Sequence, residues 1–265
     1  MIGRPIETLA LVLVVACVSS CAADAVAKVA PLQRCEAVAP SAQLDPYDPE
    51  SIRKHWKDGP PIVLAMGADR HDKLRALLAR GQDPNVCLLG FSPLSLATAN
   101  GDLEEMRILL DAGADADRPR DASGGTPLLN ALGDGHYDAA RLLITRGADV
   151  RVVADGGVTT LYALANAYDL PEPGPAQVDM AQTLIDRGAA VDTRVGRPQI
   201  TPLMMASIRG HASLVRFLLA HGADPTLRDE KGQTALAFAT KKGHAAVVDV
   251  LAAAMASAAP ASSAH

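Results

Sequence analysis

Residues 201–224 read TPLMMASIRGHASLVRFLLAHGAD, and variants of this phrase recur along most of the chain. The full Thr-Pro-Leu start returns at residue 126, and close variants of it stand at residues 92, 159 and 234. A weaker copy opens with Pro60-Pro61-Ile62, so that successive starts lie 32, 34, 33, 42 and 33 residues apart. A nearly constant period of this length is typical of a repeat protein.

Each copy carries the signals of two short helices. A Thr or Ser before Pro favours a helix start, because the hydroxyl accepts from free backbone amides and the first turn does not use the missing proline N–H. A glycine nine positions after the start, such as Gly210, predicts a turn into a second helix that carries a leucine pair, as in Leu218-Leu219. A second glycine, such as Gly222, then predicts a left-handed cap. A polar stretch long enough for a β-turn finger leads to the next start.

The composition agrees with stacked thin helices. The 265 residues are 49% hydrophobic, which excludes wholesale disorder, but only 3% are aromatic, so a core must close on Ala, Leu and Val. The net charge is −5, so no basic excess indicates nucleic-acid binding.

The Thr-Pro-Leu start, the Gly-His turn and the Leu-Leu-x-x-Gly-Ala ending together resemble the ankyrin-repeat family. The resemblance covers residues 58–255 as about six repeats, and it implies an all-α solenoid of helix-turn-helix repeats with β-turn fingers. The fourth repeat departs from the pattern through an insertion near residues 169–176, and the His that often follows Thr-Pro-Leu is replaced in every copy. The first and last repeats are atypical, as terminal repeats commonly are.

The first twenty residues have the pattern of an export signal. A ten-residue apolar run, Leu9–Val18, is too short to span a bilayer. It ends in Val18-Ser19-Ser20-Cys21, which resembles the bacterial lipobox and implies a signal peptide over residues 1–20, lipidation of Cys21 and a place at the periplasmic face of the outer membrane. The alternatives are lipidation of Cys17, or cleavage after Ala22 or Ala27 to give a soluble periplasmic protein.

The segments around the repeats are expected to be simpler. Residues 21–57 are interpreted as a linker and N-terminal capping extension, and residues 256–265 as a disordered tail. Because export leads to an oxidising compartment, Cys35 and Cys87 are expected to form a disulfide. Two unpaired thiols are the alternative.

The sequence contains no residues with the spacing of a catalytic site, so no enzyme activity and no cofactor are expected. His136, His211 and His244 each follow the mid-repeat glycine of a separate repeat, which favours helix starts over a shared metal. The aspartates within residues 111–121 lack the glycine and terminal glutamate of a calcium loop.

The family resemblance implies that a partner is contacted by the fingers and by the ends of the first helices. Carried over to this chain, these positions are Trp56, Leu88, Leu89, Phe91, Asn100, Arg197, Ile200, Arg209, Lys231, Lys241 and Lys242. The surface would be apolar toward its N-terminal half and basic toward its C-terminal half. Alternatively, Trp56, Leu88 and Leu89 pack beneath residues 35–55 as a cap, and the basic side chains are simply solvated.

These features predict a monomeric module, tethered to the cell envelope, that binds another protein through its concave face. Membrane contact would be through the lipid anchor only, and nucleic acid is not an expected partner. A sharper hypothesis is an inhibitor or immunity protein acting against a secreted or envelope-acting effector. The alternative is a structural or stress-protective scaffold of the envelope with no inhibitory role.

Overall fold

The computed structural model describes residues 50–51, 59–67, 69–87, 90–119, 124–167 and 174–258. All of them belong to one compact unit, Arg34–His265. The signal peptide, Cys21, Cys35 and most of the predicted capping extension lie outside the described residues. Among the helices that the structure describes, none has the length and apolar character needed to cross a membrane.

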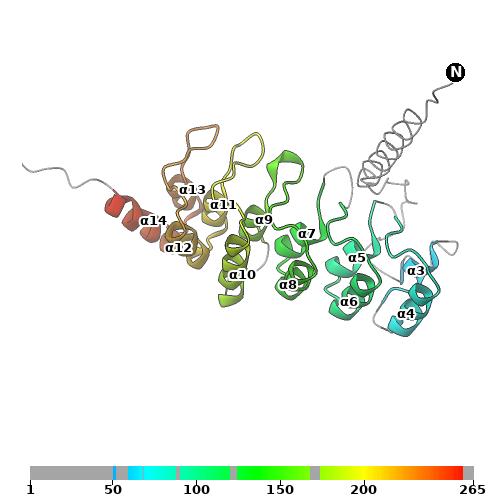
Figure 1. Ribbon diagram of the computed structural model, residues 1–265. Helices are drawn as coiled ribbons and strands as arrows, with labels where there is room; N and C mark the ends of the chain where they lie inside the picture. The colour runs from blue at the N-terminus through cyan, green and yellow to red at the C-terminus, as the bar shows by residue number, and fades with distance from the viewer. Residues whose placement is uncertain are drawn as a thin grey trace, which may run out of the picture. The chain divides into compact units, whose positions relative to one another are not determined.

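The described segments form six consecutive helix pairs (Figure 1). The pairs are α3 (Pro61–Leu64) and α4 (His71–Ala79), α5 (Pro93–Ala99) and α6 (Leu103–Asp111), α7 (Pro127–Gly133) and α8 (Tyr137–Thr145), α9 (Thr160–Ala165) and α10 (Pro175–Asp186), α11 (Pro202–Arg209) and α12 (Ala212–Ala220), and α13 (Ala235–Lys242) and α14 (Ala245–Ala258). Two isolated bridges, Val153–Thr159 and Val195–Ile200, pair extended residues within two fingers. The all-α fold and the six repeats predicted from the sequence are therefore confirmed.

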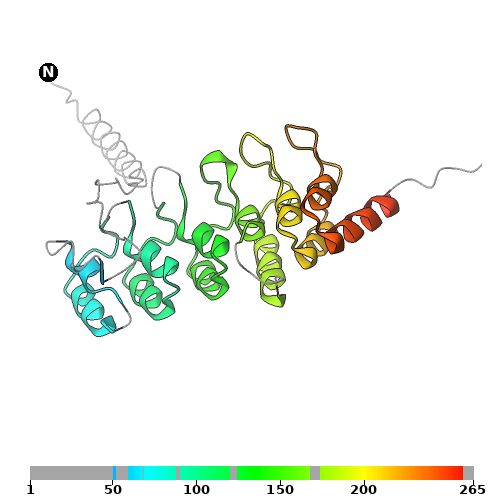
Figure 2. The same ribbon diagram turned by 180° about the vertical axis from the view of Figure 1, so that it is seen from behind.

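The pairs stack so that their helices make two layers. The first helices α5, α7, α9, α11 and α13 contact one another in chain order, and so do the second helices from α4 to α14. The fingers project beyond the first-helix layer, on the side away from the second helices, as both views show (Figures 1 and 2). Each repeat therefore rests on its neighbours in the chain, as expected of a solenoid.

The helix starts form as the sequence predicts. In five repeats the Ser or Thr hydroxyl oxygen accepts the backbone N–H three residues further on, at 3.1–3.4 Å. The capping residues are Ser92, Thr126, Thr159, Thr201 and Thr234. Each cap satisfies an amide that the helix itself leaves free, which stabilises it by about 1 kcal/mol.

The core lies between the layers and consists of small and aliphatic side chains. Ala97, Ala131 and Ala206 are completely buried in the first helices, where a larger side chain would separate neighbouring repeats. Leu203 and Leu218, predicted to be interior, are each 1% exposed. Close packing of this kind needs no aromatic rings, which accounts for their scarcity.

The terminal repeats differ from the central ones. In the first repeat α3 has only four residues, and its contacts with α5 are sparse. In the last repeat α14 has 14 residues and continues to Ala258, into the predicted tail, while residues 259–265 lie outside the description.

Candidate protein-binding groove

The groove is the surface between the fingers and the exposed side of the first helices. In the described part of the chain, its hollow lies between the third and fourth repeats and has a volume of about 310 Å³. Leu129, Asn130 and Gly133 on α7, Tyr162 on α9, and the short 3-10 turn η1 (Asp155–Gly157) contribute to its walls.

Two glycines, which carry no side chain, leave this hollow open. Gly133 ends α7 and Gly125 precedes its capping threonine, so neither position fills the space with a side chain. A Cβ atom built on Gly133 would meet nothing within 4 Å. Gly133 and Asp134 stand seven and eight positions after Thr126, so the same offsets that selected contact residues elsewhere could have found them. The prediction of contact residues did not include the third and fourth repeats, where the same offsets also give Val158 and Asn166 of this hollow.

The hollow combines apolar walls with an acidic rim. Leu129 is 5% exposed and Val158 is half-buried, whereas Asp134 and Asp155 are exposed. Val153, on the same finger as Asp155, is 60% exposed and is the large apolar side chain that stands out most from the described surface. Exposed apolar groups beside charges are typical of surfaces that bind proteins.

The predicted contact residues take different roles in the structure. Arg197, Lys231, Lys241 and Lys242 are exposed on the fingers and first helices of the fifth and sixth repeats, and Asn100 is exposed at the end of α5. Arg209 donates from Nη2 to Oδ1 of Asn166 at 2.7 Å, so it is held against the preceding repeat.

The remaining predicted contacts are buried or lie outside the description. Ile200 is only 7% exposed and belongs to the core, where its backbone pairs with Val195. Phe91 is half-buried and packs against the core. Trp56, Leu88 and Leu89 lie outside the described residues, so their role as a site or as a cap stays a prediction.

Carboxylate and amide side chains tie neighbouring fingers together. Asn85 accepts the N–H of Asp115 at 2.8 Å, and Asp117 accepts the N–H of Asp149 at 2.9 Å. A third such bond runs from the N–H of Asp224 to Asp192, at 3.1 Å. Burial raises the pKa of both Asp117 and Asp192, although the backbone donors partly offset this. Asp117 thus helps to hold neighbouring fingers in a row, which gives it a structural role.

Three histidines each connect their repeat to the one before it. The ring of His136 bonds to the carbonyl oxygen of Thr98 at 3.1 Å, and that of His244 to the carbonyl oxygen of Ile208 at 3.0 Å. His211 is 4% exposed, and its Nδ1 lies 3.3 Å from Nε2 of Gln177. Burial, with smaller contributions from Arg209 and His244, lowers the pKa of His211 to about 4, so its ring is neutral at pH 7. No metal-binding cluster occurs in the part of the chain that the structure describes.

Cys87 takes part in a disulfide bond, and Nη2 of Arg118 lies 3.2 Å from its sulfur. Its expected partner, Cys35, lies outside the described residues. The pairing of these two cysteines stays a prediction.

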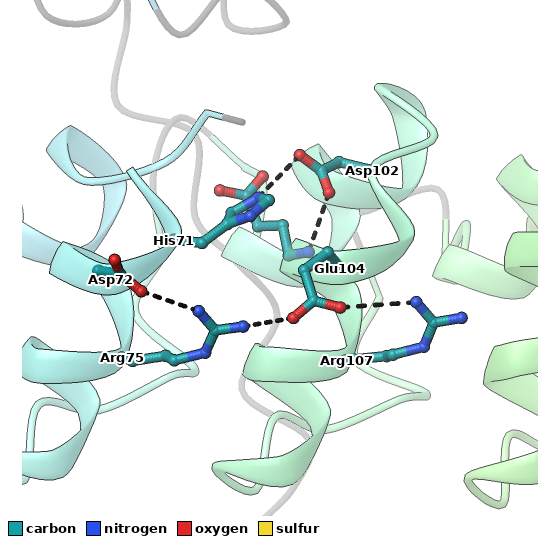
Figure 3. A network of polar contacts seen from close by, with 7 residues as sticks. His71, Asp72, Arg75, Asp102, Glu104 and Arg107 are labelled. Carbon is teal, nitrogen blue, oxygen red and sulfur yellow. Dashed lines mark hydrogen bonds and ion pairs between the residues drawn. The ribbon is translucent and has the colours of Figure 1, made fainter. Parts of the chain in front are cut away.

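A larger hollow of about 450 Å³ lies between α4 and α6, on the second-helix side. Figure 3 shows that Arg75 there pairs with Asp72 and with Glu104, and that Glu104 also pairs with Arg107. These charges already have partners, so this hollow offers less to a ligand than the groove does.

Comparison with known proteins identifies the repeat. A family model described as "Ankyrin repeats (3 copies)" matches residues 62–154 and 174–259, which is more than half of the chain. Ankyrin repeat and SOCS box protein 16 of Homo sapiens is 36% identical over 145 residues, which are 55% of this chain and 30% of that protein. Ankyrin repeat and MYND domain-containing protein 1 of Homo sapiens is 32% identical over 194 residues, or 67% of this chain and 20% of that protein. Palmitoyltransferase ZDHHC17 of Rattus norvegicus is 35% identical over 107 residues, which are 40% of this chain and 16% of that protein. The chain thus spans less than a third of the length of these relatives.

Proposed function

Because the chain belongs to the ankyrin-repeat family, whose repeats typically serve interaction rather than catalysis, we propose that its groove binds a partner protein. The observation that carries this proposal is the hollow between the third and fourth repeats, set beneath a row of fingers that hydrogen-bond to one another. A surface that is already ordered loses little conformational entropy when it binds.

The charges along the groove favour a partner with two complementary features. The rim at Asp134 and Asp155 suits a lysine or arginine whose apolar stem lies along Val158. The exposed Lys241 and Lys242, on the last turn of α13, suit an acidic patch. Complementary potentials of this kind speed association and fix the register of the complex.

We place this module in the cell envelope, anchored through a lipid on Cys21, as an inhibitor or immunity protein for an envelope-acting effector. The support for export and anchoring is the short apolar run followed by Val18-Ser19-Ser20-Cys21. The proposed inhibition rests on the proposed binding of a partner protein in this groove. A scaffold that binds without inhibiting is the outcome against which this is tested.

Site-directed photo-crosslinking in cells identifies the partner. A crosslinker at Val153 on the exposed finger should capture one envelope protein, whereas a crosslinker at Arg216, exposed on α12 in the other layer, should not. Capture of the same protein from both positions would argue against the groove.

Binding of the purified partner then tests the acidic rim. The double variant Asp134→Lys with Asp155→Lys should weaken binding at least tenfold. The control, Asp138→Lys with Asp179→Lys, makes the same charge change at exposed positions of α8 and α10 and should bind like wild type. Equal losses in both would show that net charge, and not the groove, governs binding.

Deletion of the gene separates inhibition from scaffolding. An inhibitor predicts self-intoxication that one suppressor mutation in the captured partner cures. A scaffold predicts envelope defects that no single mutation in the partner cures.

A further inference from the structure

Glu105 occupies a core position. It is the third residue of α6, and the third residues of α8, α12 and α14 are the apolar Ala139, Leu214 and Val247. All four side chains are buried, and Glu105 is only 1% exposed. A carboxyl group at a position that these three repeats keep apolar conflicts with the core, and such conflicts often mark a special role.

The carboxyl group joins the first repeat to the second. One of its oxygens accepts the backbone N–H of Gly67, in the loop between α3 and α4, at 2.8 Å. Beside it, Asp102 accepts the N–H of Glu105 at 2.9 Å and lies 3.1 Å from Nε2 of His71 on α4 (Figure 3). We call Gly67, His71, Asp102 and Glu105 the acidic joint.

Few charges compensate a negative charge on Glu105. Burial raises its pKa to about 7, the Gly67 N–H lowers it, Asp102 raises it and His71 lowers it. Of the other charged groups nearby, Arg70 before α4 pairs with Asp69. The neighbouring Glu104 is turned to Arg75, on the outer side of the helices. From the third repeat, the ring of His136 is bonded to the Thr98 carbonyl oxygen.

The first repeat has a neighbour on one side only, so it depends on the acidic joint more than an inner repeat depends on any one of its contacts. Within the described residues, α3 is short and its contacts with α5 are sparse, so the first repeat contacts the second through α4 against α6 and through the bond from Asp115 to Asn85. The end repeat of a solenoid has one neighbour and can open without unfolding the rest.

We propose that the acidic joint is a proton-operated clasp, which holds the first repeat on the second in mild acid and releases it as pH rises. A protonated carboxyl group can be buried and still accept the Gly67 N–H through its carbonyl oxygen, whereas the ionised group must leave water without a full counter-charge. Release would open the end of the solenoid next to the finger that carries Phe91.

The direction of the pH effect on docking follows from the linkage between docking and proton binding. Burial in the folded chain raises the pKa of Glu105 from its ordinary value of 4.5 to about 7, so the docked state binds the proton more tightly than a state that exposes the carboxyl group to water. The stabilisation is therefore fully present below pH 4.5 and is lost as pH rises through 7. These two values correspond to about a 70-fold weaker docking equilibrium at pH 8 than at pH 5.

Hydrogen exchange of the full chain tests the clasp. Protection factors of α4, corrected for the intrinsic pH dependence of exchange, are compared with those of α12 in the same molecule between pH 5 and pH 8. The protection of α4 relative to α12 should fall by about 70-fold in wild type. Constant relative protection would overturn the proposal.

Two variants assign the effect to Glu105. Glu105→Gln keeps an acceptor for Gly67 and should remove the pH dependence. Glu104→Gln, at the neighbouring half-buried position turned to Arg75, should retain it. If Glu105→Gln leaves the first repeat open throughout, Glu105→Leu, the residue type found at the equivalent position 214, should close it at both pH values. A wild-type slope that persists in either Glu105 variant would show that another group operates the joint.

Discussion

Gly210 lies against the ring of His244 in the next repeat, and Gly210→Ala should destabilise the protein strongly. The residue ends α11 with φ 82°, and a Cβ built there would lie 2.7 Å from Nδ1 and 2.8 Å from Cε1 of His244. Ordinary van der Waals contact requires about 3.4–4 Å, so the imidazole ring would have to move by roughly an ångström. That movement would break the 3.0 Å bond from His244 to the Ile208 carbonyl oxygen.

The same substitution in the second repeat provides the control. Gly101 has φ 67°, and a Cβ there would lie 3.6 Å or more from the ring of His136, which is ordinary contact. Both alanines carry the strain of a left-handed backbone, about 1–2 kcal/mol. Gly210→Ala adds overpacking of about 1–3 kcal/mol and a weakened hydrogen bond of about 1 kcal/mol. We therefore expect a loss of unfolding free energy of about 1–2 kcal/mol for Gly101→Ala and about 3–6 kcal/mol for Gly210→Ala.

Urea unfolding, followed by circular dichroism at equal protein concentration, measures the loss of unfolding free energy in Gly101→Ala and in Gly210→Ala. Gly243→Ala, with φ 76° and nothing within 4 Å of the built Cβ, extends the control to the last repeat. Adding His244→Ala to Gly210→Ala should recover part of the loss, because the clashing ring is then gone. If Gly101→Ala and Gly210→Ala lose the same unfolding free energy within about 0.5 kcal/mol, the steric reasoning is refuted.

Four further predictions concern the core, the histidine and the cysteines. Leu218→Ala should lower the free energy of unfolding by about 2–5 kcal/mol, because Leu218 is 1% exposed, and a loss below 1 kcal/mol in urea titrations would contradict this. The lowered pKa of His211 means that the folded state binds the proton less tightly than the unfolded state does. Stability that is present above pH 6.5 should therefore be lost as pH falls toward 4. In unfolding titrations over this pH range, His211→Gln should flatten the decline. Fatty-acid labelling should mark wild type and not Cys21→Ser, and label that persists would move the anchor elsewhere. Peptide mapping without reductant should find Cys35 linked to Cys87, which by chain entropy would stabilise by about 4 kcal/mol, whereas two alkylatable thiols would refute the pairing.

The local structure of the repeats could be predicted because it depends on residues close in sequence. Thr201 meets the amide that it caps within one helical turn, and Gly222 takes a left-handed φ of 86° to end the second helix. Both interactions recur at the repeat period, so a pattern of caps, glycines and leucines is enough to place helix pairs. The resemblance to ankyrin repeats placed Lys241 and Lys242 at the end of a first helix, where the structure finds them exposed.

Contacts between repeats were decided only by the tertiary structure. The hollow depends on Gly133 and η1, which are brought together by stacking and not by proximity in the chain. Asp117 bonds an amide 32 residues away, and sequence reasoning could only judge it as a member of a local acidic cluster. Ile200 follows the offset of a contact residue, but its finger turns it into the core.

Glu105 shows the boundary between the two kinds of information most clearly. The sequence by itself determines that a carboxylate stands where other repeats have Ala139, Leu214 and Val247. Only the tertiary structure supplies the Gly67 N–H, 38 residues away, that the carboxyl group meets. The physical reason is that a repeat motif encodes the hydrogen bonds within one turn of helix, whereas the energy of a buried charge depends on every group that folding places around it.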